Sequence, residues 1–443
     1  MDTEITADTP IADEQARDYG GWDVLWTWFG AGVNTGSWYF GGVAAGLGMA
    51  FVLQSALLWM PLLMIPWAAI AYLAWRRGVS TVGVTVPALG TQGSRLTGLG
   101  QFLVLSGWPS INTFIAAISL SFVFKAALGW PAFGEPGSTE PMIIGILLTA
   151  IAQGVISVLG HQAIRYLERI SAALLIVLGG WETYVVFTHW DLARIMAFSL
   201  PNAGGQTWAT IADIAFGLGW TWAQVGDFAR LGRSGRGTTL GSWLGVNLGQ
   251  GWFIVIGGLG VIGVALTSGH YDPENSDPSS TLAALGLGLG LVAFLVLVFS
   301  TVSTNVTNIY GAGMGLSAMV RSRPRSALLA VALFQLVLCF VPLVYGSFLD
   351  YFMNFLTWIG GFFVPLWTVV LLDWALRRGT GYGRVSAFNA AGLISVVLGL
   401  LAFFIVDMGL PALEAQITAS LPAIVVTSLS YFVLTAGGAK LRG

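Results

Sequence analysis

Apolar segments of about 20 residues, the length that a helix needs to cross a ~30 Å hydrocarbon core, follow one another along the whole chain. Of the 443 residues, 56% are hydrophobic and only 9% are charged, so the chain lacks the polar surface of a water-soluble fold. A net charge of -2 offers no basic patch to a nucleic acid. We therefore predict an all-α integral membrane protein in the lipid bilayer, with no nucleic acid and no obligate protein partner.

The apolar segments predict twelve transmembrane helices, with both termini on the same side. The predicted spans lie near 23–47, 49–75, 97–127, 141–160, 164–189, 207–228, 239–267, 288–318, 325–345, 350–376, 386–406 and 420–437. No soluble domain fits between them. The chain is therefore expected to form a single transmembrane domain over 22–437, with tails at 1–21 and 438–443.

The distribution of basic residues predicts the orientation of these helices. Seventeen of the 19 Lys and Arg residues fall in the tails or in every second loop, and only Lys125 and Arg194 fall in the opposite loops. Because basic residues concentrate on the cytoplasmic side, both termini are expected in the cytoplasm. The first 20 residues lack the apolar run of a signal peptide, so we expect a cytosolic tail and an inner (plasma) membrane location, typical of bacteria.

The chain contains few of the residues from which hydrolytic or metal sites are made. Its only histidines are His161, His189 and His270, and its single cysteine is Cys339. A Ser-His-Asp triad or a histidine-based metal site is therefore not expected. We predict that the protein is not an enzyme.

A Phe-Gly-x-Gly pattern occurs within the first span, at Phe29–Gly32, and within the sixth, at Phe216–Gly219. A helix can be interrupted at membrane depth only where it lines a protein-enclosed cavity. Gly-interrupted segments at corresponding places in two halves indicate inverted repeats around a midplane site. The repeats would cover about 22–190 and 207–376, leaving two additional helices at 386–437. Close helix packing is the alternative explanation of these glycines.

Span eight carries an unusual polar run from Ser300 to Asn308. On a helix, one face holds Ser300, Ser303, Thr304 and Thr307, and an adjacent stripe holds Thr301, Asn305 and Asn308. Hydroxyls beside the carbonyls of a broken helix suit an alkali cation, whereas amides suit a heterocycle with mixed donors and acceptors. We interpret the run as two ligand-binding faces. Hydrogen bonding between helices is the alternative.

Span three places Trp108 and Asn112 one turn apart on one face, with Pro109 between them. A flat aromatic wall beside an amide would hold a planar base. Trp220 and Trp222 in span six offer the same chemistry, but with 19 Trp residues in the chain many will be interfacial anchors or core.

Few acidic residues lie within the spans. Glu182 and Asp213 are the candidates for proton carriers, since acids inside the membrane are costly and by default functional. Asp227 and Asp373 are followed by an arginine three or four residues later, which indicates anchors at the cytoplasmic ends of their helices.

Several of these motifs together resemble the nucleobase-cation-symport-1 family, which includes cytosine, purine and pyrimidine permeases and hydantoin and allantoin transporters. The resemblance covers about 22–437, and its motifs are the broken first span, Ser106-Gly107-Trp108, Gly226–Arg233, the span-eight run, and Pro365 followed by Asp373 and Arg377-Arg378. It implies a five-plus-five inverted-repeat fold with helices 1 and 6 broken and two extra helices. It also implies alternating access and import of a cytosine- or purine-like base by symport with a cation, which we expect to be sodium.

The resemblance also implies two sets of site residues. The sodium site would comprise Gly30, Val33, Ser300, Ser303 and Thr304. The substrate site would comprise Asn34, Trp108, Asn112, Gly217, Leu218 and Asn305, to which we add Trp220 and Asn308. Leu218 stands where many members have an aromatic residue, so the resemblance does not carry over the identity of the ring.

Other functions remain open from the sequence. A proton could replace sodium through Glu182 or Asp213, in a symporter of allantoin-like, hydantoin-like or thiamine-precursor substrates. From other classes, a channel would conduct without saturation, a membrane enzyme would turn its substrate over covalently, and a receptor would bind without transport.

Overall fold

The computed structural model describes residues 17–159, 161–200, 207–285, 290–320, 322, 324–377 and 385–435. These residues form a bundle of helices, and their only β-type pairing is a bridge between Tyr19 and Gly232. In chain order the helices are α1 (Gly21–Gly32), α2 (Thr35–Ala44), η2 (Ala45–Leu47), α3 (Met49–Gln54), η3 (Ser55–Trp59), α4 (Met60–Arg77), α5 (Thr81–Leu89), α6 (Arg95–Leu128), α7 (Thr139–Leu159), α8 (His161–His189), α9 (Leu192–Met196), α10 (Trp208–Trp220), α11 (Val225–Ala229), α12 (Gly235–Ser268), η5 (Pro273–Asn275), α13 (Pro278–Leu285), α14 (Gly290–Val320), α15 (Pro324–Leu338), α16 (Val341–Tyr345), α17 (Phe348–Leu376), α18 (Ala390–Gly409), α19 (Pro411–Ile417) and α20 (Ser420–Leu434).

Within the described residues, nine helices are long and apolar enough to cross a membrane, or ten if the bent pair α19 and α20 is one span. The nine correspond to predicted spans two to five and seven to eleven. The first, sixth and twelfth predicted spans fall on shorter helices, namely α1 with α2, α10 with α11, and α20. The all-α membrane class is therefore confirmed, and the count of twelve stays a prediction.

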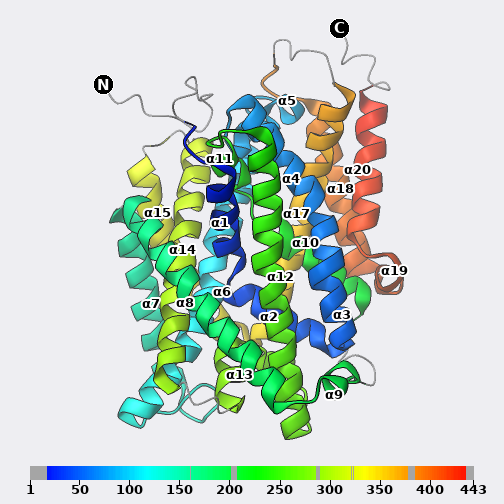
Figure 1. Cartoon of the computed structure of the whole chain (residues 1–443). Helices are drawn as coiled ribbons and strands as arrows, with labels where there is room; N and C mark the ends of the chain where they lie inside the picture. The colour runs from blue at the N-terminus through cyan, green and yellow to red at the C-terminus, as the bar shows by residue number, and fades with distance from the viewer. Residues whose placement is uncertain are drawn as a thin grey trace.

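The chain's loops gather at the two ends of the bundle. At one end, α1 begins and α20 ends (Figure 1). There Tyr19 N donates to Leu231 O at 3.1 Å, and Thr91 N donates to Ser386 O at 3.0 Å. These bonds join the segment before α1 to the one after α11, and the segment after α5 to the one before α18.

Different loops meet at the opposite end. Tyr271 Oη donates to Gly42 O at 3.0 Å, and Leu349 N donates to the Glu274 carboxylate at 3.1 Å. The loop between α12 and α13 is thereby bound to α2 and to the start of α17. The loops next to α1, α5, α11 and α18 thus lie at one end of the bundle, and those next to α2, α13 and the start of α17 lie at the other.

Glycines on α12 position the first span. A Cβ on Gly245 or Gly249 would overlap the carbonyl oxygen of Leu25 or Phe29, respectively, on α1. The four-residue spacing of these glycines lets the backbone of α1 lie directly on α12. α12, at the centre of the bundle, therefore supports the segment in which the first span breaks (Figure 1).

The first span breaks where the sequence predicts. α1 ends at Gly32 and α2 begins at Thr35. Asn34 has an extended backbone and caps α2, since its Oδ1 accepts from Ser37 N at 2.9 Å. Its Nδ2 donates to Ala31 O at 2.9 Å and so also covers the end of α1. One carboxamide thus satisfies backbone groups on both sides of the break.

The position of the second break corrects the prediction. α10 continues through the Phe-Gly-x-Gly pattern to Trp220, and the interruption falls at 221–224, before α11. A Cβ on Gly217 would overlap Leu356 O of α17, and one on Gly219 would lie 2.8 Å from Met64 Sδ of α4. These glycines therefore serve close helix packing, which was the alternative explanation of the pattern.

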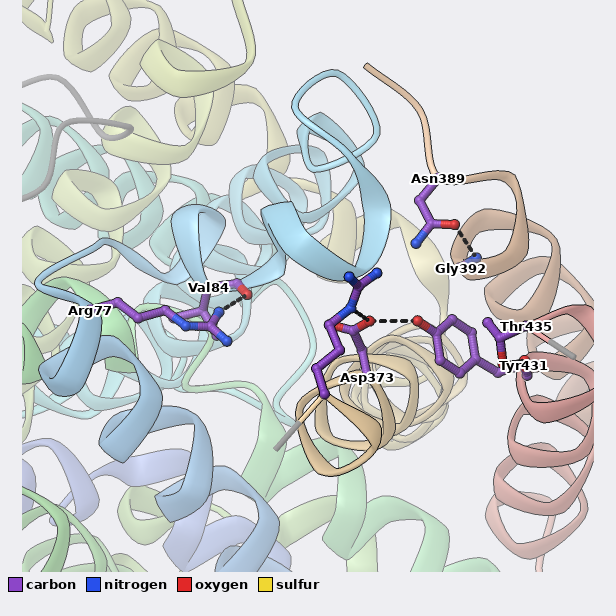
Figure 2. Close-up of polar contacts among 8 residues, drawn as sticks. Arg77, Val84, Asp373, Asn389, Gly392, Tyr431 and Thr435 are labelled. Atoms are coloured by element: carbon purple, nitrogen blue, oxygen red, sulfur yellow. Dashed lines mark hydrogen bonds and ion pairs between the residues drawn. The ribbon is translucent and has the colours of Figure 1, made fainter. Parts of the chain in front are cut away.

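The two acidic residues expected to be anchors fasten helices to one another. Asp373 Oδ1 accepts from Arg377 Nε at 2.7 Å and from Tyr431 Oη at 2.7 Å, which joins α17 to α20 (Figure 2). Asp227 Oδ2 accepts from Gln101 Nε2 at 2.9 Å and so joins α11 to α6.

Candidate substrate site

A small cavity lies where the two breaks meet α6 and α14. Its lining consists of Asn34, Trp108, Asn112, Leu218, Trp222, Thr304 and Asn308. The cavity is small, with room for about one ordered water molecule. A planar ring must therefore enlarge the cavity in order to enter it.

Trp108 links the two breaks. Its indole Nε1 donates to Thr221 Oγ1, at the first residue of the break between α10 and α11. At its other edge, a Cβ on Gly36 would lie 2.7 Å from Trp108 Cζ3, so this ring position requires glycine at the start of α2. Phe355 packs edge-on against the indole, with ring centroids 5.5 Å apart. The indole is therefore held in a fixed orientation, with one part facing the cavity.

Two tryptophans of the sixth span point to different places. Trp222 lines the cavity from the break, and its backbone carbonyl accepts from Trp67 Nε1 at 3.0 Å. Trp220 instead donates from its indole to Leu63 O of α4 at 2.8 Å. The structure thus brings Trp222 to the cavity, whereas Trp220, which was predicted to bind substrate, faces α4.

Asn112 forms part of the cavity wall, and Asn305 lies directly behind it. Asn112 lines the cavity and donates from Nδ2 to Asn305 Oδ1 at 2.9 Å. Asn305 is fully buried and does not line the cavity. Asn308 and Thr304, which flank it on α14, do so instead. Of the amide stripe predicted in span eight, the structure therefore brings Asn308 to the cavity and places Asn305 behind Asn112.

Neighbouring residues of α10 also differ in position. Leu218 lines the cavity, whereas Gly217 faces Leu356 of α17. The structure therefore brings together five of the eight expected substrate residues: Asn34, Trp108, Asn112, Leu218 and Asn308. Gly217, Trp220 and Asn305 lie one layer outside.

Four of the five residues expected to bind sodium lie in two groups, with Ser300, Ser303 and Val33 in one and Thr304 in the other. Ser300 and Ser303 are buried on α14, and no described residue makes a hydrogen bond to Ser300 Oγ. Val33, in the first break, belongs to an apolar cluster that also contains Leu297, one turn before Ser300. Thr304 faces the substrate cavity.

Gly30 lies outside both of these groups. A Cβ on Gly30 would lie 3.5 Å from the Ala172 side chain, so this residue faces α8.

The two intramembrane acids differ in their surroundings. Asp213 accepts from Ala419 N at 2.6 Å and from Ser420 N at 3.0 Å, so it holds the start of α20. Glu182 is fully buried, and neither carboxylate oxygen has a hydrogen-bond partner among the described residues. It lies against Gly260 of α12 and near Thr281 of α13.

Three further polar residues near the cavity did not stand out in the sequence. Thr221 accepts the hydrogen bond of Trp108. Asn305 donates to Gln153, and Gln153 in turn donates to Gln335. Each glutamine is the only side-chain amide on its helix, which is a signal in itself, because strongly polar side chains are costly in the membrane. Their pairing is a tertiary contact that spacing along the chain does not reveal.

A cavity between two discontinuous helices is the arrangement in which many membrane transporters bind their substrates. The chain belongs to the family of permeases for cytosine/purines, uracil, thiamine and allantoin, whose sequence model matches residues 10–433. This membership places the protein among transporters rather than enzymes and confirms the resemblance found in the sequence.

Two relatives have been named by function. A putative purine-cytosine permease of Bacillus subtilis (strain 168) is 22% identical over 314 residues, which cover 66% of this chain and 62% of that protein. The purine-uracil permease NCS1 of Arabidopsis thaliana is 24% identical over 330 residues, which cover 69% of this chain and 53% of that protein. The chain therefore matches less than two thirds of the length of either relative.

Solved structures share the fold over nearly the whole chain. The inward-facing conformation of Mhp1 aligns with a TM-score of 0.74 at 15% identity, covering 97% of this chain and 93% of that one. Mhp1 in a closed conformation with bromovinylhydantoin bound gives 0.73 at 15% identity, covering 98% and 96%. A Na+-coupled sialic acid symporter gives 0.66 at 10% identity, covering 97% and 93%.

Proposed function

We propose that this protein imports a planar nitrogen heterocycle of the nucleobase class, together with a cation, by alternating access. The observation that carries the proposal is the composition of the cavity, which combines two indoles with three carboxamides. Indole faces suit a flat ring, and carboxamides both donate to and accept from its edges. The names of the two relatives and the hydantoin bound to Mhp1 point to the same chemical class.

In this proposal the ring stacks on Trp108 and Trp222, and its edges bond to Asn112 and Asn308. Asn34 contributes less to binding, because its amide already caps both sides of the first break. The cavity must expand to admit the ring. Trp108 is bonded across to the second break, so movement of that break relative to α6 would open the site.

We also propose how the helices and tails of the protein are arranged in the membrane. Twelve helices would form two inverted repeats of five, at about 22–190 and 207–376, and two additional helices at about 386–437. Tails at 1–21 and 438–443 would lie in the cytoplasm, and the protein would reside in the inner (plasma) membrane. The alternation of basic residues between loops supports this orientation.

The coupling ion in this proposal is sodium. Its ligands would be the hydroxyls of Ser300, Ser303 and Thr304, with the backbone at Gly30 and Val33. The buried Ser300 hydroxyl, which no described residue satisfies, supports a ligand at this position. Binding of sodium and substrate would strengthen each other equally, because such coupling is reciprocal.

Replacing Ser300 with alanine is expected to raise the sodium concentration for half-maximal uptake about tenfold, since one oxygen ligand of a charged ion is lost. Uptake of labelled substrate into proteoliposomes at graded sodium measures the change. Thr301→Val is the matched control, because Thr301 is also buried without a hydrogen-bond partner but lies on the other stripe. An equal effect of both substitutions, or of neither, would remove Ser300 from the sodium site.

The proton-coupled alternative rests on Glu182, the buried carboxylate without a partner among the described residues. An unpaired buried carboxylate is stable only as the neutral acid or beside a cation. Asp213 is a weaker candidate, since its carboxylate is bonded to the start of α20.

If sodium is the coupling ion, we expect Glu182→Gln to retain sodium-driven uptake within about twofold. The glutamine side chain is neutral and similar in shape to the neutral acid that it replaces. Proteoliposomes with an imposed sodium gradient or an imposed pH gradient measure the two driving forces separately. If wild-type uptake follows the pH gradient without sodium and the variant loses it, the proton is the coupling ion.

Ligand-induced stabilisation tests the proposed substrate class directly. Thermal unfolding of the purified protein would be compared with cytosine, uracil, adenine, guanine, allantoin and hydantoin, each in sodium and in choline. A ligand at a hundredfold excess over Kd stabilises the folded state by about 2.7 kcal/mol. A shift with one ring that appears only in sodium supports both parts of the proposal, and no shift with any ring would withdraw the heterocycle.

A further inference from the structure

A chain of buried side-chain amides leads from the cavity into the bundle. Its members are Asn112 on α6, Asn305 on α14, Gln153 on α7 and Gln335 on α15, and none is more than 2% exposed. Four polar side chains in a membrane interior are costly unless every donor and acceptor is used. The hydrogen bonds of these four amides therefore show how each side chain is oriented.

The hydrogen bonds between these amides all have the same direction, with each nitrogen donating to the oxygen of the next amide away from the cavity. Asn112 Nδ2 donates to Asn305 Oδ1 at 2.9 Å, and Asn305 Nδ2 donates to Gln153 Oε1 at 2.7 Å. Gln153 Nε2 donates to Gln335 Oε1 at 2.7 Å. At the far end, Gln335 Nε2 donates to the backbone carbonyl of Ala332 at 3.0 Å.

The backbone carbonyl of Ala332, which ends the row of amides, fixes the direction of these hydrogen bonds. A carboxamide can usually be turned over, because its oxygen and nitrogen exchange places with little change in shape. A backbone carbonyl, however, can only accept, so Gln335 must present its nitrogen to Ala332 O. Its oxygen then faces Gln153, and the same constraint passes through Gln153 and Asn305 to Asn112. Turning over any one amide would set two donors or two acceptors against each other.

Asn112 is the only member that lines the cavity. Its Oδ1 faces α2, where it accepts from Thr35 Oγ1 at 3.3 Å, and its Nδ2 faces α14. Among the described residues these are its only hydrogen bonds, which leaves one N–H and one acceptor position of the carboxamide for a ligand. In contrast, the nitrogens of Asn305 and Gln153 each donate twice within the protein, with Thr113 Oγ1 as their second acceptor.

We propose that Gln335, Gln153 and Asn305 form a one-way amide relay that fixes the orientation of the Asn112 carboxamide and thereby selects the hydrogen-bonding edge of the substrate ring. The three residues are positioning residues, since they act through Asn112. The inference rests on the proposed function, because it takes the central cavity as the place where the ring binds.

Cytosine and uracil are matched probes for this relay. The rings have similar size and shape, but cytosine presents an acceptor at N3 beside an amino donor at position 4. Uracil presents an N3–H donor beside a carbonyl acceptor. A carboxamide held in one orientation distinguishes these reversed edges, whereas one that is free to turn over accommodates both.

The relay can be cut far from the cavity by Gln335→Met, which keeps the approximate volume and removes both hydrogen-bonding groups. The wild-type protein is expected to bind one of the two rings more tightly, and the variant to reduce the ratio of the two Kd values about tenfold. Binding to the purified protein by isothermal titration calorimetry gives both constants. Thr149→Val on α7 is the matched control, since its buried hydroxyl has no partner among the described residues and lies one turn from Gln153.

A double-mutant cycle distinguishes positioning from general destabilisation. In an Asn112→Ala background, Gln335→Met should leave the ratio of the two Kd values unchanged, because the residue through which it acts is gone. A structural defect would instead weaken both rings equally in either background. If Gln335→Met does not fold, Gln153→Leu cuts the same relay one step closer to the cavity.

The outcomes separate the inference from the function on which it rests. If the wild-type protein binds neither ring, nor any other heterocycle in the stability panel, the proposed function fails. If it binds them and the ratio survives the cut relay, or if the wild-type ratio is already near one, the relay does not select the edge and this inference alone is overturned.

Discussion

Replacing Trp108 with alanine is expected to weaken binding of a ring substrate by about 1–3 kcal/mol, or roughly 5- to 150-fold, the range found when an aromatic side chain that stacks on a base is truncated. The substitution removes a wall of the cavity and also the hydrogen bond to Thr221 that links α6 to the second break. The loss should therefore appear both in affinity and in the rate of transport.

Two other substitutions separate these contributions. Trp108→Phe keeps a flat ring but removes the indole N–H, so it should restore most of the affinity while leaving the Thr221 contact broken. Trp358→Ala is the control for removing an indole as such, because Trp358 is 64% exposed on the outside of α17. Titration of purified protein with the substrate measures the affinity. Wild-type affinity in Trp108→Ala would exclude Trp108 from the site.

The first break was predictable because its local chemistry is complete in the sequence. Gly32 lets α1 lie on α12, and Asn34 two residues later is a preferred helix cap. Glycine followed by a capping residue signals the end of one helix and the start of another. In the sixth span Thr221 follows Gly219 at the same spacing, but its hydroxyl accepts from Trp108 and caps no helix, and α10 continues to Trp220.

The candidate cavity could be predicted in part, for a related physical reason. Residues one turn apart on a single helix share a face, so Trp108 and Asn112 were found together from their spacing. The choice between Trp220 and Trp222 depends on the angle at which the chain leaves α10. Trp220 contacts α4, to which it donates its hydrogen bond, and Trp222 lies past the end of α10. Periodicity within one segment contains no information about those contacts.

The amide relay illustrates what spacing along the chain cannot reveal. Gln153 and Gln335 are 182 residues apart, and each is the only side-chain amide on its helix. The sequence identifies both as costly polar residues in lipid but cannot say that they meet. It also placed Asn305 on a ligand-binding stripe, whereas the fold turns that residue toward Gln153.

Replacing Gly217 with alanine is expected to lower the stability of the protein by about 1–3 kcal/mol or more, because the new methyl group would overlap the carbonyl oxygen of Leu356. α10 would have to move away from α17, and its other close contacts along the same face would loosen with it. A fall in the melting temperature of the purified protein, measured without ligand, detects this effect.

Gly180→Ala is the matched control, since a Cβ at Gly180 meets nothing within 4 Å and alanine favours a helix over glycine by about 1 kcal/mol. It should leave the melting temperature unchanged or raise it slightly. The comparison also separates the two roles considered for Gly217. A packing glycine predicts lower stability even without substrate, whereas a glycine that contacts substrate predicts normal stability and weaker binding. Because the second break begins just after α10, displacement of this helix should also disturb Thr221 and, through it, the orientation of Trp108.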